Sequence, residues 1–536
     1  MSKKSLLKGA MWGTLAVFLS KVLGFIYLIP FNRFLDVDQQ IVFTSSYRIY
    51  AYVLLIATAG IPFAVANLIA RYNANNNYHI SLKILKLTTI IMLIIGFICF
   101  IILFLFAKPL AYIIVTSTAS VEVITHISIG IKIIALALIV VPLVSVVRGF
   151  FQGYQEIKIT SVSQLVEQFI NSGFIIAALL LAGGGLLNNL YAVYFAILCA
   201  TIASIGSLIY LILKYFKLKD IFDNYYHNSN HHIEVSNKLL IKEILQISIP
   251  FIVVVLLAQS NDLIDLLYTI NGLTAHGLHI EQAKEFSTIY GASVIKLMTI
   301  PLTLSTGISV ALVPHLAEYY AKKDKKQLRN TILNILENTM IVLIPIVILM
   351  VATGYEVFYV IGQIHNASYG AVIFNYFAIY IIINTLSIIV DNMMLTLNQS
   401  KRALIFIIVA TIFKLSATYF LIKQFGILGL ALSSAIACLL SLVPSLIVLK
   451  NIYHLTFNRF FRVSIISLLC SLVMFVIVYI FKELIPNGNY LLMFIKTAIL
   501  YIIGLGCYGL LAWHFKIIPV QIKNLLLRKL KRNHAA

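Results

Sequence analysis

Five lysines lie inside long apolar stretches of this sequence: Lys21, Lys132, Lys296, Lys414 and Lys496. A lysine at the centre of a bilayer costs about 2.5–3.5 kcal/mol, so such residues usually face a bundle interior or a water-filled cavity. Their shared positive charge suits an anionic ligand, and an ammonium group holds phosphate as a point charge without requiring planar geometry. The pattern therefore predicts a cavity that binds an anion.

Lys21 and Lys296 are the strongest candidates for ligand contact. Neither has an acidic residue within a helical turn, so a local ion pair does not account for either charge. Arg48 lies just outside the second apolar stretch and belongs to the same predicted cavity set. We expect these cations to contact the ligand.

Two interpretations remain open for Lys132. It either lines the cavity or forms a structural ion pair with Glu167 or Glu122. Lys496 lies about two helical turns from the outer end of its stretch, so its side chain should extend to water. Replacing Lys496 with alanine should then have little effect.

Acidic residues form a second group inside the apolar stretches. Gln259, Asp262 and Asp265 recur every three residues, which places them along one helix face, and Asp391 and Lys414 lie in later stretches. A carboxylate in a bundle can bind a proton or Na⁺, or can neutralise a lysine. Pairing of Asp262 and Asp265 with Lys414 is favoured over an ion-coupling site, and both remain open.

A polar stripe follows the fifth apolar stretch. Gln164, Glu167, Gln168 and Asn171 occur at i, i+3, i+4 and i+7 and therefore share one helix face. Such a stripe either lines a cavity or makes hydrogen bonds between helices. Cavity lining is the favoured interpretation.

Motifs for covalent or metal chemistry are not found in the sequence. The five cysteines have no metal-like spacing, and His231 and His232 have no partner cluster nearby. No Gly-x-x-x-x-Gly-Lys-Ser/Thr phosphate loop is present. We therefore expect no metal site, disulfide or cofactor, and any coupling would use the membrane potential, H⁺ or Na⁺.

Fourteen apolar stretches must position these residues. A membrane-spanning helix needs about 20 apolar residues, and 61% of the chain is hydrophobic, 11% is charged and the mean hydropathy is +0.98. The sequence predicts an all-α polytopic membrane protein with 14 transmembrane helices. They are expected near residues 9–31, 49–70, 84–107, 124–147, 159–182, 189–213, 244–269, 288–316, 331–353, 369–396, 403–422, 427–449, 463–481 and 490–514.

Basic residues gather on one side of this predicted zig-zag. With the N-terminus in the cytoplasm, the outer side receives only Arg33, Arg48, Lys108, Lys284, Lys423 and Lys482. An excess of Lys and Arg marks the cytoplasmic side, so both termini should be cytoplasmic. The net charge of +21 then reflects topology and contact with anionic lipids, and nucleic acid is not an expected partner.

The chain divides into two predicted six-helix lobes in parallel pseudo-repeat around a central cavity. Residues 60–72 and 307–319 resemble each other, and both close the second predicted helix of a half. Substrate is held between the halves of such transporters. The predicted divisions are 1–213, a cytoplasmic linker at 214–243, 244–450, a helix pair at 451–515 and a basic amphipathic tail at 516–536.

Three segments resemble a known family. They are Ser20 to Phe31, Ala57 to Asn73 and Val140 to Gln168, and the last holds the most specific motif, Arg148-Gly149-Phe-Phe-Gln152-Gly153. Over essentially its whole length, the chain resembles the polysaccharide-exporter and lipid II flippase branch of the multidrug/oligosaccharidyl-lipid/polysaccharide flippase superfamily. Its Gram-positive group, which includes the stage V sporulation protein B type, is the most similar.

The resemblance implies two lobes around a V-shaped cavity, with the last two helices forming a lipid-facing groove. It implies outward flipping of an undecaprenyl-pyrophosphate saccharide, with Lys21 and Lys296 at the positions of the family's cavity cations. Tyr27 stands where a further basic residue is common in lipid II flippases, so the saccharide remains open. Cell-wall synthesis enzymes are candidate partners in the cell membrane.

Other functions are ranked lower. A capsule or teichoic-type exporter is the alternative that is hardest to exclude, because it would use the same pyrophosphate carrier. A cation-coupled multidrug exporter would be expected to place acids, not lysines, in its cavity. A membrane enzyme would need a catalytic acid or histidine cluster near an interface, and the dispersed His residues do not supply one.

Overall fold

The computed structural model describes most of the chain as α-helix. The described residues are 23–24, 26–58, 60–74, 76–115, 121–154, 156–227, 229, 235–303, 316, 319–320, 324–363 and 366–517, and they contain no strand. Ten helices in this part are long and apolar enough to cross a membrane. The all-α polytopic class is therefore confirmed.

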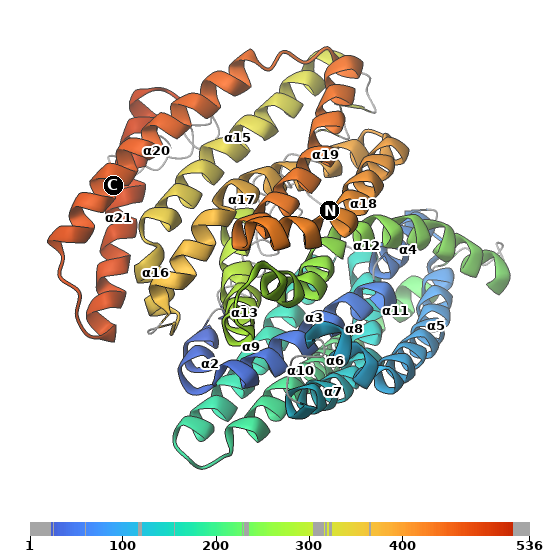
Figure 1. The fold of residues 1–536 in the computed structure, drawn as a ribbon. Coiled ribbons are helices and arrows are strands. Elements are labelled where there is room, and N and C mark those ends of the chain that lie inside the picture. The colour runs from blue at the N-terminus through green and yellow to red at the C-terminus, as the bar shows by residue number, and fades with distance from the viewer. Residues whose placement is uncertain are drawn as a thin grey trace, which may run out of the picture. The chain divides into compact units, whose positions relative to one another are not determined.

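The described chain forms two compact units, Met1–Ala292 and Ser293–Ala536 (Figure 1). The helices of the first unit are α2 (Leu28–Phe34), α3 (Val37–Thr58), α4 (Ile61–Ala74), α5 (Tyr78–Leu105), α6 (Ala107–Val115), α7 (Val121–Ala135), α8 (Ala137–Gly153), α9 (Ile157–Gly183), α10 (Asn189–Lys217), α11 (Lys219–His227), α12 (Asn237–His276) and α13 (Ile280–Thr288). A π-helical turn, η1 (Ile289–Val294), spans the boundary between the units.

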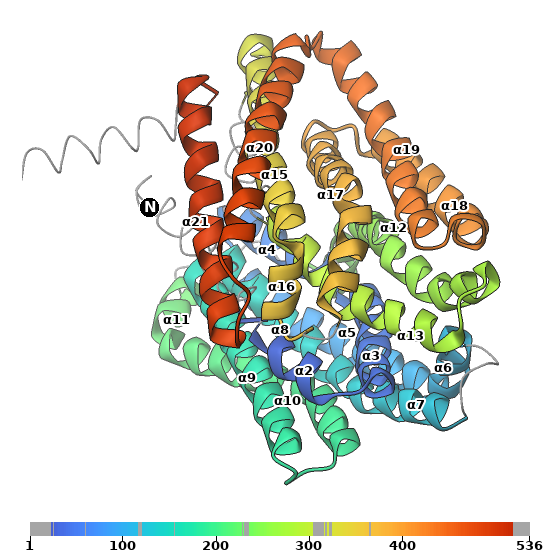
Figure 2. The same cartoon turned by 60° about the vertical axis from the view of Figure 1, so that its left-hand side comes forward.

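The second unit contains the remaining described helices. They are α15 (Lys325–Ala352), α16 (Gly354–Val360), α17 (Ala367–Thr396), α18 (Ser400–Phe425), α19 (Ile427–Tyr453), α20 (Asn458–Leu484) and α21 (Tyr490–His514). Several sequential helices pack as antiparallel pairs, as Figure 2 shows for α20 with α21 and for α9 with α10 in the first unit.

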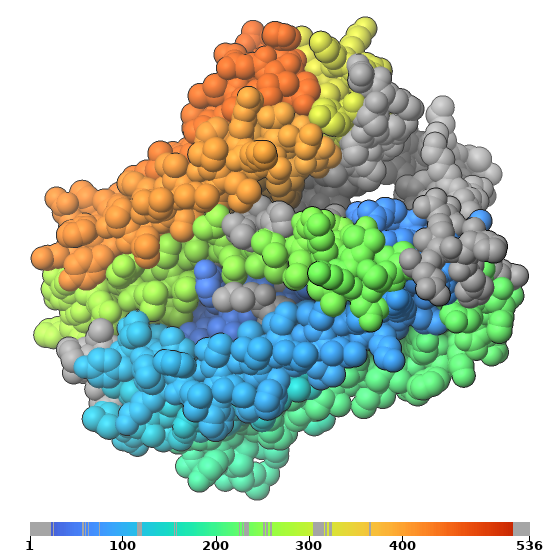
Figure 3. Space-filling view, turned by 90° about the vertical axis from the view of Figure 1, so that its right-hand side faces the viewer, coloured from blue at the N-terminus to red at the C-terminus, as the bar shows by residue number. Residues whose placement is uncertain are grey.

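The outer faces of the helices remain apolar. On α5, Ile94, Phe97, Ile98 and Ile102 are each about half exposed, whereas Ile84, Met92 and Leu103 are fully buried. This helix lies at the surface of the first unit, in blue in Figure 3. A helix that is apolar all round yet exposed on one side is suited to contact lipid.

The second predicted helix is divided in the structure. Residues 49–70 were expected as one helix, but α3 ends at Thr58 and α4 begins at Ile61. Gly60 between them has φ +81°, a conformation that glycine adopts without steric cost. Pro62 stands in the first turn of α4, where its missing N–H has no helical partner to lose.

The boundary between the compact units also differs from the predicted lobe boundary. The sequence placed residues 244–269 in the second lobe, but α12 packs against α3, α4 and α6 of the first unit. Arg71 of α4 reinforces this packing, because its Nη2 lies 2.7 Å from Glu243 Oε2 on α12. The segments 307–315 and 518–536, which include most of one predicted repeat and the amphipathic tail, lie outside the described residues.

Candidate functional site

Arg148 is the centre of a polar network in the first unit. Its Nη2 donates to Glu167 Oε2 on α9 at 2.6 Å and to Ser207 Oγ on α10 at 3.0 Å. Its Nε donates to Ser163 Oγ on α9 at 2.8 Å. The Arg148 side chain is 15% exposed and that of Glu167 is 31% exposed, so the pair is largely withdrawn from solvent. The network joins α8, α9 and α10.

Glu167 therefore pairs with Arg148 and not with Lys132, so that predicted alternative for Lys132 is wrong. Lys132 Nζ lies 5.3 Å from the ring centroid of Phe104, where the ammonium group contacts the ring face, and the lysine is exposed. The other candidate partner, Glu122, lies 3.6 Å from His126 Nε2.

The two glycines of the Arg-Gly-Phe-Phe-Gln-Gly motif allow α8 to approach α4 closely. A Cβ added to Gly149 would lie 2.8 Å from the Pro62 carbonyl oxygen, and one added to Gly153 would lie 2.6 Å from Ile69 Cβ. Glycines four residues apart form a flat helix face of the kind that membrane helices use for packing. The sequence identified this motif by resemblance, and the structure gives its glycines a packing role.

The remaining motif residues have different environments. Phe150 and Phe151 are fully buried, and Phe150 contacts the rings of Tyr154 and Phe222. Gln152 is exposed. The motif therefore combines one partly buried ion pair, a helix-packing face and an aromatic cluster.

The polar stripe of α9 is half-buried. Gln164, Gln168 and Asn171 are all neither fully buried nor exposed. Gln168 Nε2 donates to Ser172 Oγ at 3.0 Å, and a Cβ added to Gly24 would lie 3.3 Å from the same nitrogen. With Glu167 bound to Arg148, the stripe makes contacts between helices, and lining of a cavity stays a prediction.

Arg48 and the acids of α12 are held within the first unit. Arg48 Nη2 donates to the backbone oxygen of Asp262 at 2.5 Å, while the Asp262 side chain is exposed. Asp265 is buried and its Oδ2 accepts a hydrogen bond from Tyr290 OH at 2.9 Å. The side chain of Gln259 lies outside the described residues. These bonds fix α12 to α3 and to the π-helical turn.

A second ion pair fastens α13 to α3. Lys284 Nζ lies 3.1 Å from Asp38 Oδ1 and 3.2 Å from Glu281 Oε1. Burial alone would lower the pKa of Lys284, but the hydrogen bonds and charges of the two carboxylates outweigh it and raise that pKa. The ammonium group therefore stays charged and fastens the two helices.

In the second unit, Lys414 and Asp391 each have a hydroxyl partner. Lys414 is fully buried and its Nζ donates to Ser434 Oγ at 2.8 Å, which joins α18 to α19. Asp391 Oδ1 on α17 accepts from Ser441 Oγ on α19 at 3.4 Å. The proposed pairing of Lys414 with Asp262 and Asp265 would bridge the two units and stays a prediction.

Lys296 lies two residues after the end of the π-helical turn η1 and is half-buried. Its backbone oxygen accepts from Thr299 Oγ1 at 2.7 Å. π-Helical turns are uncommon and often occur at functional sites, because the extra residue redirects the side chains that follow. This turn was not predicted from the sequence. Lys21, the other expected ligand contact, lies outside the described residues.

Lys496 does not extend to water, so the sequence interpretation of this residue is wrong. Its side chain is 3% exposed, and its Nζ lies 3.6 Å from Glu356 Oε1 and donates to Asn487 Oδ1 at 2.8 Å. Lys482 Nζ lies 3.2 Å from the other oxygen of Glu356. The buried carboxylate of α16 therefore holds α20 and α21 through two lysines.

Replacing Lys496 with alanine should consequently lower the unfolding temperature of the protein. The change leaves Glu356, which is 1% exposed, with one fewer cation, and such a loss costs on the order of 1–3 kcal/mol. Thermal unfolding in detergent measures the effect. Lys108→Ala, at an exposed position, is the matched control, and equal unfolding temperatures for the two variants would contradict a structural role for Lys496.

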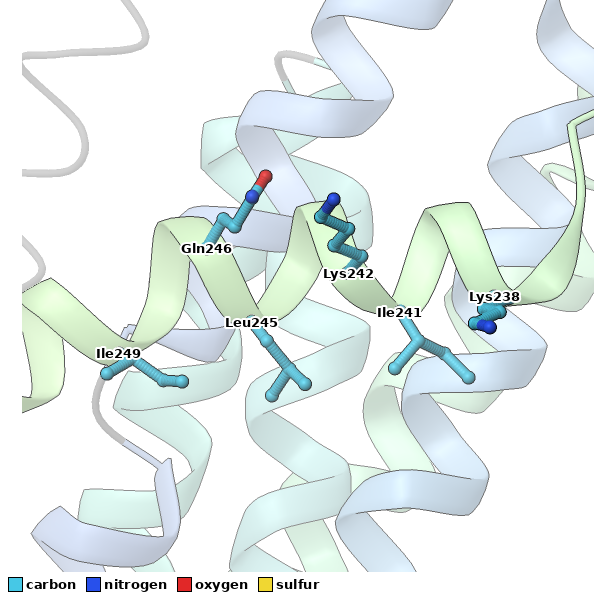
Figure 4. A pocket seen from close by; sticks show the side chains of 6 residues that line it. All are labelled: Lys238, Ile241, Lys242, Leu245, Gln246 and Ile249. Atoms are coloured by element: carbon cyan, nitrogen blue, oxygen red, sulfur yellow. The ribbon is translucent and has the colours of Figure 1, made fainter.

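A basic hollow of about 660 Å³ lies beside the first half of α12. Lys238, Lys242 and Gln246 line it together with three aliphatic residues, Ile241, Leu245 and Ile249. Figure 4 shows Lys242 and Gln246 on one edge of the helix and the aliphatic side chains on the other. This arrangement suits an amphiphile that carries both an anionic group and an apolar chain.

Sequence reasoning missed this hollow and the Glu356 cluster. Lys238 and Lys242 were counted as residues of a cytoplasmic linker, although their i, i+4 spacing beside Ile241 and Leu245 is an amphipathic signal. Among the described residues, no group of three His, Cys, Asp or Glu side chains could hold a metal ion. The five cysteines have free thiols.

Comparison with known proteins identifies relatives over most of the chain. Residues 6–319 match the family described as "Polysaccharide biosynthesis protein". The lipid II flippase MurJ of Bacillus subtilis (strain 168) is 30% identical over 482 residues, which cover 88% of each chain. Stage V sporulation protein B of the same organism is 23% identical over 328 residues, or 60% of each chain.

Solved structures of low sequence identity share the fold. The inward closed conformation of a lipid II flippase MurJ superposes with a TM-score of 0.69 at 13% identity and covers 94% of this chain and 98% of that one. An inward-facing multidrug resistance transporter of the MATE family gives a TM-score of 0.61 at 10% identity, over 81% of this chain and 94% of that one.

Proposed function

The chain belongs to the polysaccharide biosynthesis protein family, and we propose that it flips an undecaprenyl-pyrophosphate-linked saccharide from the inner to the outer leaflet of the cell membrane. The 30% identity to a lipid II flippase over 88% of both chains is the observation that carries this proposal. The protein is a multi-pass membrane transporter and not an enzyme. Lipid II or a related peptidoglycan precursor is the proposed cargo.

The charges of the chain match the parts of such a substrate. Lys21 and Lys296 are the proposed contacts of the pyrophosphate. Lys238 and Lys242 beside the hollow of α12 are suited to receive the same group at the cytoplasmic side, with Ile241 and Leu245 beside the prenyl chain. Polar residues such as Gln164 and Gln168 would hydrogen-bond the sugar.

The polar network of Arg148 would hold the first unit rigid during transport. Its hydrogen bonds to Glu167 and Ser207 link three helices that must move together if the halves rock about a central cavity. Arg48, bonded to the backbone of α12, would transmit movement of α12 to α3 in the same way. Lys132 is the weakest of the proposed substrate contacts, because its ammonium group lies over Phe104.

The driving force is proposed to include the membrane potential. An inside-negative potential favours outward movement of an anion by about 2.3 kcal/mol per charge per 100 mV. Asp391 and Asp265 are the proposed sites if H⁺ or Na⁺ also couples to transport. Both termini are proposed to lie in the cytoplasm. The chain is also proposed to contact anionic lipids and to associate with cell-wall synthesis enzymes.

Genetic rescue tests the proposed substrate. Cells depleted of their essential lipid II flippase should regain growth when this chain is expressed, and lipid-linked precursors should stop accumulating in the inner leaflet. Persistent accumulation, together with full abundance of the chain in the membrane, would contradict the lipid II assignment. Restored capsule or teichoic-type polymer in a matching exporter mutant would then assign the related saccharide.

A further inference from the structure

A second pocket lies wholly within the second unit, and none of its lining residues is a proposed substrate contact. Its volume is about 170 Å³, and α15, α17, α19 and the start of α20 enclose it. Leu336, Leu386, Val390 and Leu442 form its buried wall. Apart from one lysine, all its lining residues are apolar.

The pocket opens onto the exposed apolar surface of the helices. Val443, Ile447 and Phe461 line it and are 46%, 51% and 59% exposed. In a membrane protein such a surface faces hydrocarbon chains, so the pocket is accessible from the lipid phase. An apolar chain can enter it without breaking hydrogen bonds.

The one charged lining residue stands at the end of the pocket. Lys450 is exposed and lies in the last turn of α19, next to the aromatic residues Phe457, Phe460 and Phe461. Leu442, at the other end, precedes it by eight residues, or about 12 Å along the helix. The pocket thus runs from a helix end, where an interface is expected, into the apolar part of the span.

The surrounding charges leave this end of the pocket positive. Glu337 is buried next to the wall residue Leu336, but Arg459 Nη2 lies 3.1 Å from its Oε2 and compensates it. Arg462 is exposed one turn further along α20. Lys450 at the end of α19 matches a headgroup phosphate, and the apolar pocket beside it matches an acyl chain.

We propose that this pocket binds one anionic glycerophospholipid, with an acyl chain between α17, α19 and α20 and the headgroup phosphate at Lys450. Bound lipid would fill the space among four helices and so stabilise the second unit. A ligand that binds the folded state raises its stability in proportion to the logarithm of ligand concentration over Kd. The effect should depend on headgroup charge.

The test uses the full chain, purified and stripped of lipid in detergent. Thermal unfolding is measured with increasing phosphatidylglycerol, or with phosphatidylcholine of the same acyl chains, and native mass spectrometry counts the retained lipids. We expect phosphatidylglycerol to raise the unfolding temperature more than phosphatidylcholine does. Lys450→Gln should weaken the apparent affinity for phosphatidylglycerol roughly fivefold and leave that for phosphatidylcholine unchanged.

A bulky residue that fills the pocket tests whether an acyl chain occupies it. Leu446→Trp should abolish the stabilisation by both lipids, and Val443→Trp on the exposed rim serves if the first variant does not fold. Lys401→Gln and Ile412→Trp, both at exposed positions of α18, are the matched controls and should behave as wild type.

Three outcomes would overturn the proposal. The first is equal stabilisation by the two lipids with no effect of Lys450→Gln. The second is lipid retention that does not fall when Leu446→Trp fills the pocket. The third is a dimer that Leu446→Trp dissociates, which would make a second copy of the chain the occupant.

Discussion

Arg148→Met is expected to destabilise the protein by about 1–3 kcal/mol, because it leaves the carboxylate of Glu167, which is 31% exposed, without its cation. The same loss is expected for Glu167→Leu, which leaves the guanidinium group uncompensated. The double variant should recover much of the stability, since two apolar side chains replace the pair. Unfolding of the purified variants in one detergent measures all three values.

The double variant makes this test specific to the ion pair. Losses that simply add would mean that Arg148 and Glu167 act independently, contrary to the 2.6 Å contact between them. Arg402→Met, at an exposed position in the first turn of α18, is the matched control and should change stability little.

Lys296→Ala is expected to reduce flipping on the order of 10- to 100-fold while membrane abundance stays unchanged. A hydrogen bond to a charged group contributes about 1.5–3 kcal/mol, which corresponds to a loss of that size. Lys296→Arg should retain most activity, because it keeps the charge. Flipping by the variants is measured in the depletion-rescue strain together with immunoblots of the membrane fraction.

The outcome for Lys296 separates a substrate contact from a structural lysine. Loss of abundance in parallel with activity would indicate a structural role like that of Lys496, which is bound to Glu356. Full activity of Lys296→Ala would remove this residue from the substrate site. Lys401→Ala, exposed on α18, should be active at normal abundance.

Helix positions were largely predictable, because the length of an apolar run reports the thickness of the hydrocarbon layer. The last helix was expected at 490–514 and α21 occupies Tyr490–His514. The division at Gly60 was not anticipated, since the apolar composition continues through it and only one backbone angle changes.

The partners of charged residues were much less predictable. Glu356 falls between two predicted spans, 331–353 and 369–396, and Lys496 lies 140 residues further along the chain. Their contact depends on how α16 packs against α21, which no local pattern encodes. Burial of Lys496 could therefore not be distinguished from extension to water.

Arg148 and Glu167 show an intermediate case. Both were singled out, Arg148 by family resemblance and Glu167 by its place on a polar stripe, but the sequence did not indicate that they pair. The structure explains the motif through tertiary contacts with Ser163, Ser207 and α4. The types of the residues showed that Arg148 and Glu167 matter, whereas the packing of the helices determined that they form a pair.

The central claim is outward flipping of a pyrophosphate-linked saccharide, and reconstitution tests it most directly. Purified protein is placed in vesicles that contain a fluorescent polyprenyl-pyrophosphate saccharide, and a membrane-impermeant reagent reports the lipid in the accessible leaflet. We predict that wild-type protein accelerates its appearance there, that a potential negative on the departure side increases the rate, and that Lys296→Ala vesicles remain near the protein-free rate. Vesicles that transport a cationic drug but leave the saccharide lipid in its original leaflet would contradict the account.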